Sequence, residues 1–134
     1  MEIILDADVL IRGEKGSFDL RGWIASRSDD SFGVAAITVA ELWHGIERAT
    51  AGHRTKRERY LREALGNLGV VAYTEQTAYI HAALWAKLVS SGKTIGFYDL
   101  IVAATALELN CPVATFNQKH FAVVPGLNVI EPSF

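Results

Sequence analysis

Short aliphatic runs recur along this chain, and stretches with a helical pattern separate them. Continuous runs of this kind are typical of strands that are covered on both faces. We expect strands at residues 3–5, 33–37, 70–73 and 112–115, with a short fifth at 129–130. Strands that alternate with helices are joined by crossover connections and pair in parallel. The pattern therefore predicts an α/β fold: a three-layer α/β/α domain around a small parallel sheet of four or five strands.

Two of the predicted helices stand out by the spacing of their apolar residues. Ile80, Leu84 and Leu88 recur every four residues, so a helix over 75–89 should bury one face. From residue 100 to residue 107 only Thr105 is polar, which predicts a helix over 97–109 that is buried nearly all round. Further helices are expected from about residue 9, over 18–26, over 38–49 and over 54–68, with a loop at 13–17.

Size and composition narrow the possibilities. The 134 residues predict a single domain over 1–134, and half of them are hydrophobic, which suggests that a partner covers some apolar surface. Cys111 is the only cysteine, so no internal disulfide forms and a reducing cytoplasm fits best. We find no charged leader and no apolar run of the ~20 residues that a membrane span needs. The net charge of −2 neither indicates nor excludes nucleic-acid binding.

Carboxylates follow the predicted strands at the points where the strands end. Asp6 and Asp8 follow the first strand, Glu41 follows the second, and Asp99 lies in the first turn of the buried helix. Three of them have a local explanation: an N-cap for Asp6, a capping box of Thr38 with Glu41, and the helix dipole for Asp99. These explanations do not predict that all four acids lie at one edge of the sheet, where ligands bind in parallel α/β folds.

Such a cluster of carboxylates favours a bound cation. The charges repel one another, and a divalent ion offsets the cost of bringing them together. Oxygen ligands without a set of cysteines or histidines favour Mg²⁺ or Mn²⁺ over zinc. A metal of this kind suits phosphoryl chemistry, because it activates and orients a water and stabilises charge on the phosphate. No Gly-rich nucleotide-binding loop competes with this interpretation.

Motifs in four places resemble the PIN-domain ribonucleases, and most closely their VapC-type toxins. The motifs cover nearly the whole chain in order: 5–10, LDADVL; 37–42, ITVAEL, with 45–49, GIERA; Gly92, then 95–96 and 99–104, DLIVAA; and 115–117, TFN, with 120–121 and 124–127. The resemblance implies an endoribonuclease toxin that depends on Mg²⁺ or Mn²⁺, hydrolyses RNA phosphodiester bonds, pairs with a cognate antitoxin and forms a homodimer. By position it implies that Asp6, Glu41 and Asp99 are the catalytic acids that bind the metal.

The chain departs from the family pattern at two positions. The family often has Asn or Ser where this chain has Asp8, and often has a fourth acid near Thr115, where this chain has the neutral Asn117. We therefore leave open whether Asp8 is a further metal ligand and whether the site holds one ion or two. We expect three neighbouring polar residues to orient the metal-binding acids without binding the ion themselves: Thr38, Thr115 and Asn117.

Other polar residues were considered for RNA binding and for acid–base chemistry. A basic stretch is a candidate RNA-backbone contact, although most such runs are solvated helix faces. Its residues are Arg48, Arg54, Lys56, Arg57 and Arg59. The histidines at 44, 81 and 120 fall in or beside helices without an evident partner, which argues against a catalytic histidine.

Two alternatives remain open at this stage. The first is a PIN-like module that binds RNA or protein through a weakened site, as neutral Asn117 suggests. The second is a haloacid-dehalogenase-type phosphatase, which the Asp6-x-Asp8 spacing resembles. That class needs a late acidic pair, and the only such pair here, Asp29-Asp30, precedes the second strand.

Overall fold

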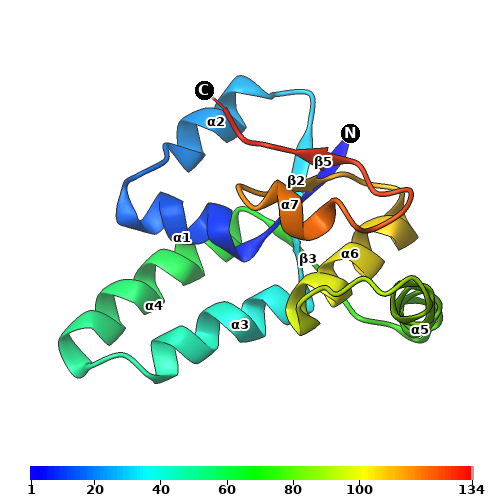
Figure 1. The fold of residues 1–134 in the computed structure, drawn as a ribbon. Coiled ribbons are helices and arrows are strands. Elements are labelled where there is room, and N and C mark those ends of the chain that lie inside the picture. Colours follow the sequence, from blue (N-terminus) through cyan, green and yellow to red (C-terminus); the bar gives the residue numbers. More distant parts are fainter. Residues whose placement is uncertain (134) are drawn as a thin grey trace.

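A five-stranded parallel sheet forms the centre of the computed structural model, which describes residues 1–133 (Figure 1). The strands are β1 Glu2–Leu5, β2 Ser31–Ala35, β3 Gly69–Val71, β4 Val113–Ala114 and β5 Val129–Ile130, in the order β3-β2-β1-β4-β5. All four pairings are parallel. The fold class predicted from the sequence is confirmed, and the fifth strand is present.

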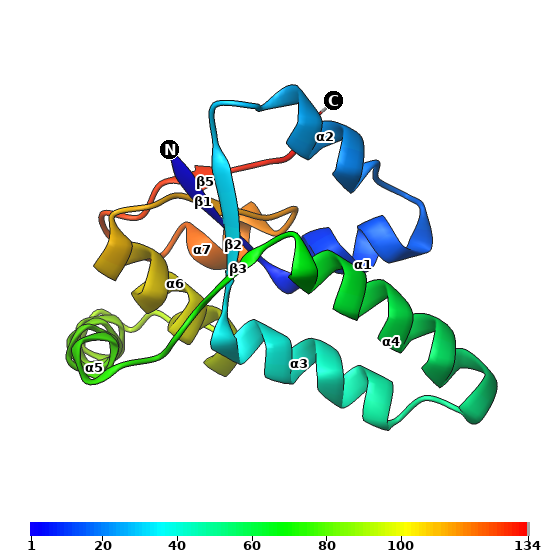
Figure 2. The same ribbon diagram turned by 180° about the vertical axis from the view of Figure 1, so that it is seen from behind.

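Helices cover both faces of this sheet. They are α1 Ala7–Lys15, α2 Leu20–Ser26, α3 Ala36–Glu47, α4 Ala51–Gly66, α5 Glu75–Ser90, α6 Phe97–Leu109 and α7 Gln118–Phe121. Figures 1 and 2 show α5 and α6 on one side of the sheet and α1, α2 and α4 on the other. No helix within residues 1–133 is both long enough and apolar enough to cross a membrane.

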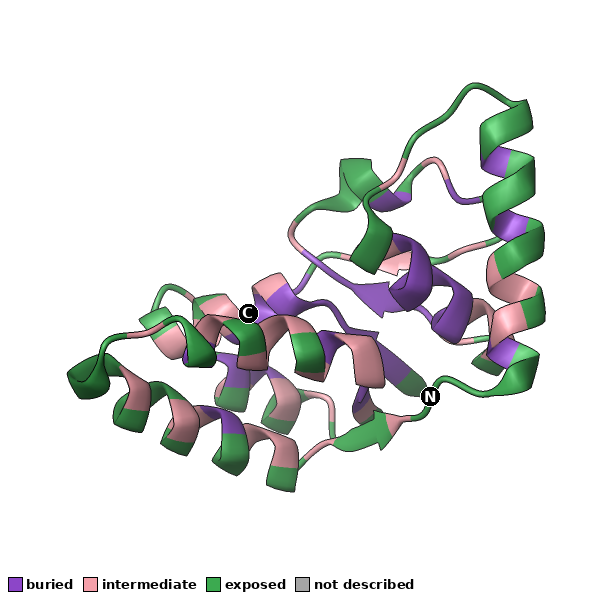
Figure 3. Cartoon of the chain, turned by 90° about the horizontal axis from the view of Figure 1, so that it is seen from below, coloured by how far each residue is buried: buried purple, intermediate pink, exposed green. Residues whose placement is uncertain are grey.

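The two faces of the sheet have separate hydrophobic cores. Ile3 and Leu5 pack with Trp23 and Leu61 on the side of α1, α2 and α4, whereas Ile4 packs with α5 and α6 on the other side. This alternation follows from the two-residue period of a strand. Helix α6 is buried from residue 100 to residue 106, as predicted (Figure 3). Both cores meet at β1, whose carboxyl end is thereby held rigidly.

Helix α1 is longer than predicted. The expected loop at 13–17 is wrong for its first three residues, because the helix runs through Gly13 and ends at Lys15, capped by Gly16 at φ 78°. A Cβ at Gly13 would lie 2.6 Å from the Tyr60 hydroxyl oxygen. Gly13 therefore allows α4 to approach α1 and does not break the helix.

The capping box predicted at Thr38 is also wrong. Strand β2 ends at Ala35 and leads directly into α3, whose N-cap is Ala35 without a side-chain cap. Thr38 lies within the first turn instead, fully buried, and its Oγ1 has no hydrogen-bond partner among the described residues. Ile37 packs against the core from the helix, so its apolar character did not distinguish helix from strand.

The remaining differences concern the ends of strands and helices. Strand β3 spans Gly69–Val71 where 70–73 was expected, and β4 spans Val113–Ala114 where 112–115 was expected. Helix α3 ends at Glu47, two residues before the predicted end, and α4 spans Ala51–Gly66 where 54–68 was expected, with Gly52 inside the helix. The short helix α7 was not predicted, because its four residues give no periodic signal.

Candidate functional site

Asp6 lies at the junction of β1 and α1 and is held from several directions. Its backbone N–H donates to the Ala114 carbonyl of β4 at 2.9 Å. Its Oδ1 accepts from the Ala7 N–H at 2.9 Å, and its Oδ2 accepts from the Thr115 hydroxyl at 2.8 Å. Only 5% of its surface is exposed. Asp6 is thus the N-cap of α1, as predicted, and also a buried carboxylate fixed at the carboxyl edge of the sheet.

Asp8 connects α1 with the segment that follows β4. Its Oδ2 accepts from the Phe116 N–H at 3.0 Å, across the end of the sheet. The Arg12 guanidinium, one turn further along α1, stacks 4.1 Å from the centre of the Phe116 ring. Asp8 is therefore more than a cap for its own helix, since it helps to position the loop that carries Thr115.

Glu41 and Asp99 reach the same region from α3 and α6, which pack against each other. Both carboxylates are partly buried. Burial, then the charges of Asp6, Asp99 and Asp8, raise the pKa of Glu41 to about 7. Burial, then the charge of Asp6, raise the pKa of Asp8 to about 6.

The pKa of each remaining acid is also raised. Burial raises the pKa of Asp6, and the charge of Asp99 adds to this, while the Thr115 hydrogen bond opposes it. Burial likewise raises the pKa of Asp99, against the influence of His120. These mutual effects place all four predicted acids in one region. Without a cation, the four carboxylates are not all ionised at neutral pH.

The cluster suits a hard divalent cation by its donor chemistry, since it presents carboxylate oxygens and a threonine hydroxyl. Its side chains do not, however, converge on one point. Within residues 1–133, no three Asp, Glu, His or Cys side chains are arranged to hold an ion together. Of the four acids, Asp6 and Asp8 are fixed by hydrogen bonds to backbone N–H groups and to Thr115, whereas Asp99 lies beside His120.

Thr115 is the central neutral residue of the site. Its hydroxyl donates to Asp6, lies within 3.4 Å of both Asp8 oxygens and accepts from the Asn117 N–H at 3.0 Å. Asn117, expected to orient ligands, acts here through its backbone, and its side chain is exposed. Thr38, the third residue predicted in this role, lies three residues before Glu41 on α3 and thus on the same side of the helix.

Replacement of Thr115 by Val should reduce activity at this site about 10- to 100-fold, the usual loss for a residue that orients a ligand. The Asp6 carboxylate would lose its only side-chain donor and point less precisely. The measurement is the initial rate of the reaction that the resemblance implies, RNA cleavage. A matched control is Thr105→Val, because Thr105 is equally buried but donates to the Ile101 carbonyl within α6. Equal losses in both variants would contradict the role of Thr115.

His120 is a site residue that sequence reasoning missed. Its Nδ1 lies 3.5 Å from Asp99 Oδ2, so the prediction that this histidine has no partner is wrong. It comes from the unpredicted helix α7, so its contact with Asp99 was not foreseen. Two signals pointed to it: its position three residues after Asn117, and its place in the motif at 120–121. His81 also has a partner, the Tyr73 hydroxyl at 2.8 Å, but lies on α5 outside the site.

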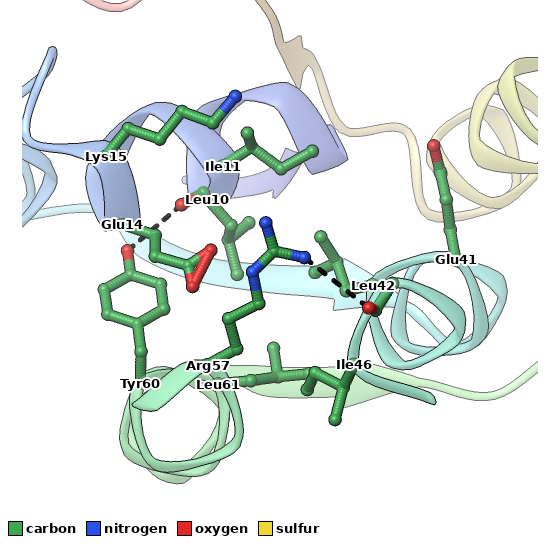
Figure 4. Close-up of a pocket in the computed structure, with 11 residues that line it drawn as sticks. Leu10, Ile11, Glu14, Lys15, Glu41, Leu42, Ile46, Arg57, Tyr60 and Leu61 are labelled. Carbon is green, nitrogen blue, oxygen red and sulfur yellow. Dashed lines mark hydrogen bonds between the residues drawn. The ribbon is translucent and has the colours of Figure 1, made fainter. Parts of the chain in front are cut away.

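A pocket of about 230 Å³ adjoins the acids between α1, α3 and α4 (Figure 4). Glu41 stands at one side of it, and Arg57 reaches into it from α4, donating to the Gly45 carbonyl at 3.5 Å. Of the predicted RNA contacts, Arg57 alone lines this pocket. Arg54 pairs instead with Glu47 at 2.9 Å, and Arg48, Lys56 and Arg59 are exposed.

Comparison with known proteins gives a consistent assignment. The model of the family described as "PIN domain" matches residues 3–127. The ribonuclease VapC of Rickettsia bellii is 30% identical over 131 residues, which is 97% of this chain and 96% of that protein. The VapC ribonuclease Y4jK of Sinorhizobium fredii is 33% identical over 136 residues, and the match covers 97% of this chain and 96% of that protein.

A solved structure supports the same assignment. The structure of VapBC-1 from nontypeable Haemophilus influenzae superposes on this chain with a TM-score of 0.84. The two chains are 26% identical, and the match covers 98% of each. The similarity therefore extends over the whole fold.

Proposed function

The chain belongs to the PIN domain family, and within it to the VapC ribonucleases, and from this premise we propose that it is an endoribonuclease toxin that uses Mg²⁺ or Mn²⁺. The observation that carries the proposal is the meeting of Asp6, Asp8, Glu41 and Asp99 at the carboxyl edge of the sheet, with pKa values raised by burial and by one another. They come from three separate segments: Asp6 and Asp8 from the start of α1, Glu41 from α3 and Asp99 from α6. A purely structural role does not require this arrangement.

The acids divide into two roles in this proposal. Asp6 and Asp99 would hold the cation directly, and the Thr115 hydroxyl orients Asp6 for this. Glu41 would hold the cation or accept a proton from the attacking water. When bound, the cation lowers the pKa of water and stabilises charge that develops on the phosphate. Asp8 adds the negative charge that neutral Asn117 does not provide.

The substrate in this proposal is RNA. Arg57 is the best placed of the basic residues to contact a phosphate beside the acids, because it lines the pocket that Glu41 borders. Three other exposed residues add positive charge near it: Arg48 at the end of α3, and Lys56 and Arg59 on α4. Because water attacks, the reaction does not need the 2′-hydroxyl chemically, so selectivity for RNA comes from shape and from single-stranded contacts.

A cognate antitoxin is the proposed inhibitor. The similar structure from H. influenzae contains VapBC-1, which supports a protein partner. Hollows suited to such a partner lie on the side of α1, α2 and α4: the pocket beside Glu41, and a larger one of about 890 Å³ between α2 and α4. Trp23 and Ile46, on the same side of the sheet, belong to the core at 2% exposure each and are not part of such a surface. The proposal also includes a homodimer and action in the cytoplasm, where RNA is the substrate.

The test is RNA cleavage by the purified protein with Mg²⁺ or Mn²⁺, with a chelator, and with a substrate that carries a single 2′-deoxy sugar at the cleaved position. We expect cleavage with either metal, none with the chelator, and continued cleavage of the 2′-deoxy substrate. Cleavage that persists in the chelator and requires the 2′-hydroxyl would contradict the proposal, because it indicates attack by the RNA itself.

The alternatives predict other outcomes. A PIN-like binding module would bind metal without cutting any of a broad set of structured RNAs. A phosphatase would release phosphate from a small phosphomonoester. The second alternative also lacks its acidic pair at the site, because Asp30 precedes β2 and pairs with Arg27 and the N-terminus. Asp6, by contrast, lies at the other end of its strand.

A further inference from the structure

Two aromatic residues at the start of α6 are exposed beside the acid cluster. Phe97 is 64% exposed and Tyr98 39%, and neither belongs to the hydrophobic core on either face of the sheet. The residues that follow on the same helix, from Leu100 to Ala106, are all buried. Packing of the fold therefore does not explain why aromatic residues occupy these two positions.

Both rings lie close to Asp99, because the three residues share the first turn of α6. One turn of a helix advances only ~5.4 Å along its axis, a distance that an aromatic side chain can span. The start of α6 also lies beside α3, the helix that carries Glu41 (Figure 1). An RNA strand whose phosphate is cut at these acids therefore passes within reach of the two rings.

The two rings contact each other edge to face, with centroids 5.5 Å apart and planes at 79°. A contact of this kind covers one face of one ring, and both side chains remain exposed to solvent. Nucleobases stack on exposed aromatic faces, and any of them can do so because every base has a π face. The pair therefore has the chemistry of a stacking platform for unpaired bases.

Lysines lie near the rings and the acids. Lys93 belongs to the exposed segment 91–94, just before Phe97, and Lys119 precedes His120, whose ring lies 3.5 Å from Asp99. Both lysines are exposed, and neither forms an ion pair within residues 1–133. Basic residues beside aromatic rings are typical of sites that bind single-stranded nucleic acid, because the charges hold the phosphates while the bases stack.

The remaining exposed aromatic residues lie elsewhere. Tyr73 follows β3, and Tyr79 and Trp85 lie on α5, which carries none of the four acids. Single exposed hydrophobic residues are common and need no functional explanation. The distinguishing feature of Phe97 and Tyr98 is thus their place in the same helical turn as Asp99, and not their exposure alone.

We infer that Phe97 and Tyr98 form the surface on which unpaired bases of the RNA stack next to the bond that is cut. This inference rests on the proposed function and names the feature of RNA that the site selects, a single-stranded segment. The bases of a duplex are already stacked on one another and do not reach the rings. Because stacking does not read the identity of a base, the two residues favour single strands over duplexes without favouring one sequence.

Binding of a short oligouridine to the full chain in a chelator tests the inference separately from cleavage. The RNA carries one central 2-aminopurine, whose fluorescence falls when the base stacks. Replacement of both Phe97 and Tyr98 by Leu keeps the positions apolar but removes the rings. This variant should lose the fluorescence change and bind about 5- to 140-fold more weakly, the equivalent of ~1–3 kcal/mol for a stacked base. Its circular dichroism should be unchanged, since both side chains are exposed.

Two further variants and a duplex serve as controls. Phe97→Tyr combined with Tyr98→Phe keeps both rings and should regain the affinity that the leucine pair loses. Tyr79→Leu removes an exposed ring on α5, away from the acids, and should bind the RNA as the wild type does. A duplex RNA of the same length should bind the leucine pair and the wild type equally.

Three results would overturn the inference: no fluorescence change with the wild type, equal affinity of the leucine pair and the wild type, or an equal loss for duplex and single strand. A leucine pair that binds RNA normally but sediments with a different mass would assign the rings to a protein contact instead. Cleavage by the wild type with Mg²⁺ is measured in parallel. Stacking without cleavage would refute the proposed activity alone, whereas cleavage without stacking would refute only this inference.

Discussion

Replacement of Asp6 by Asn raises the thermal midpoint of the metal-free protein and at the same time removes RNA cleavage. Asp6 is 5% exposed, and burial raises its pKa, so ionising it costs free energy in the fold. Asn has the same shape and can still accept from the Ala7 N–H, while its amide donates to the Thr115 hydroxyl. Removing a buried, repelled charge without losing hydrogen bonds should stabilise the metal-free protein by about 1 kcal/mol, or about 4 °C.

The loss of cleavage should exceed that of Thr115→Val, because Asp6 is a proposed direct ligand. We expect a loss of more than about 100-fold, above the range for residues that only orient ligands. Calorimetry in a chelator and cleavage with Mg²⁺ give the two readouts. Asp29→Asn is the control, since Asp29 is exposed and far from the acids in the chain, and it should change neither. A lower midpoint together with retained cleavage would show that Asp6 is only a helix cap.

Stability of the metal-free protein should fall as the pH rises from about 4 to about 7. The unperturbed pKa values are 3.8 for Asp8 and 4.5 for Glu41, whereas in the fold they are about 6 and about 7. Between these limits the folded state binds protons that the unfolded state has released. The free energy of unfolding therefore decreases with pH. The stability that protonated Asp8 and Glu41 contribute is fully present below about pH 4 and is lost as the pH rises past 7.

Mg²⁺ should reverse this trend, because it binds the deprotonated carboxylates and its affinity rises with pH. At 100 times its dissociation constant, an ion that binds only the folded state adds about 2.7 kcal/mol. The measurement is the thermal midpoint across this pH range, with Mg²⁺ and with a chelator. With the chelator, Glu41→Gln should make the thermal midpoint less dependent on pH near the upper end of this range. An equal effect of Mg²⁺ at pH 5 and at pH 7 would argue against binding by these carboxylates.

The acid cluster could be predicted from sequence because it depends on strand direction. In a parallel sheet the carboxyl ends of all strands share one edge, so Asp6 after β1 and Thr115 after β4 had to be neighbours. Asp99 could be placed because α6 is so apolar that only the centre of the domain accommodates it. The positions of Glu41 and Asp8 follow from the helices that start at this edge.

Other features depend on contacts that local patterns do not record. The capping box at Thr38 matched a general motif, but β2 passes into α3 without a loop, and the tertiary fold sets the helix start at Ala35. Gly13 resembled a loop residue and instead provides the space in which Tyr60 packs. The contact of His120 with Asp99 required the unpredicted helix α7. In each case long-range packing outweighs local propensity.

The most direct test of the central claim is a Mn²⁺ titration of the wild type and of Asp99→Asn, with ion binding and RNA cleavage measured on the same samples. We predict that wild-type cleavage rises over the concentration range in which Mn²⁺ binds. Asp99→Asn should neither bind the ion in that range nor cut the RNA. Equal cleavage by the two proteins would contradict the assignment of these carboxylates as the catalytic metal site.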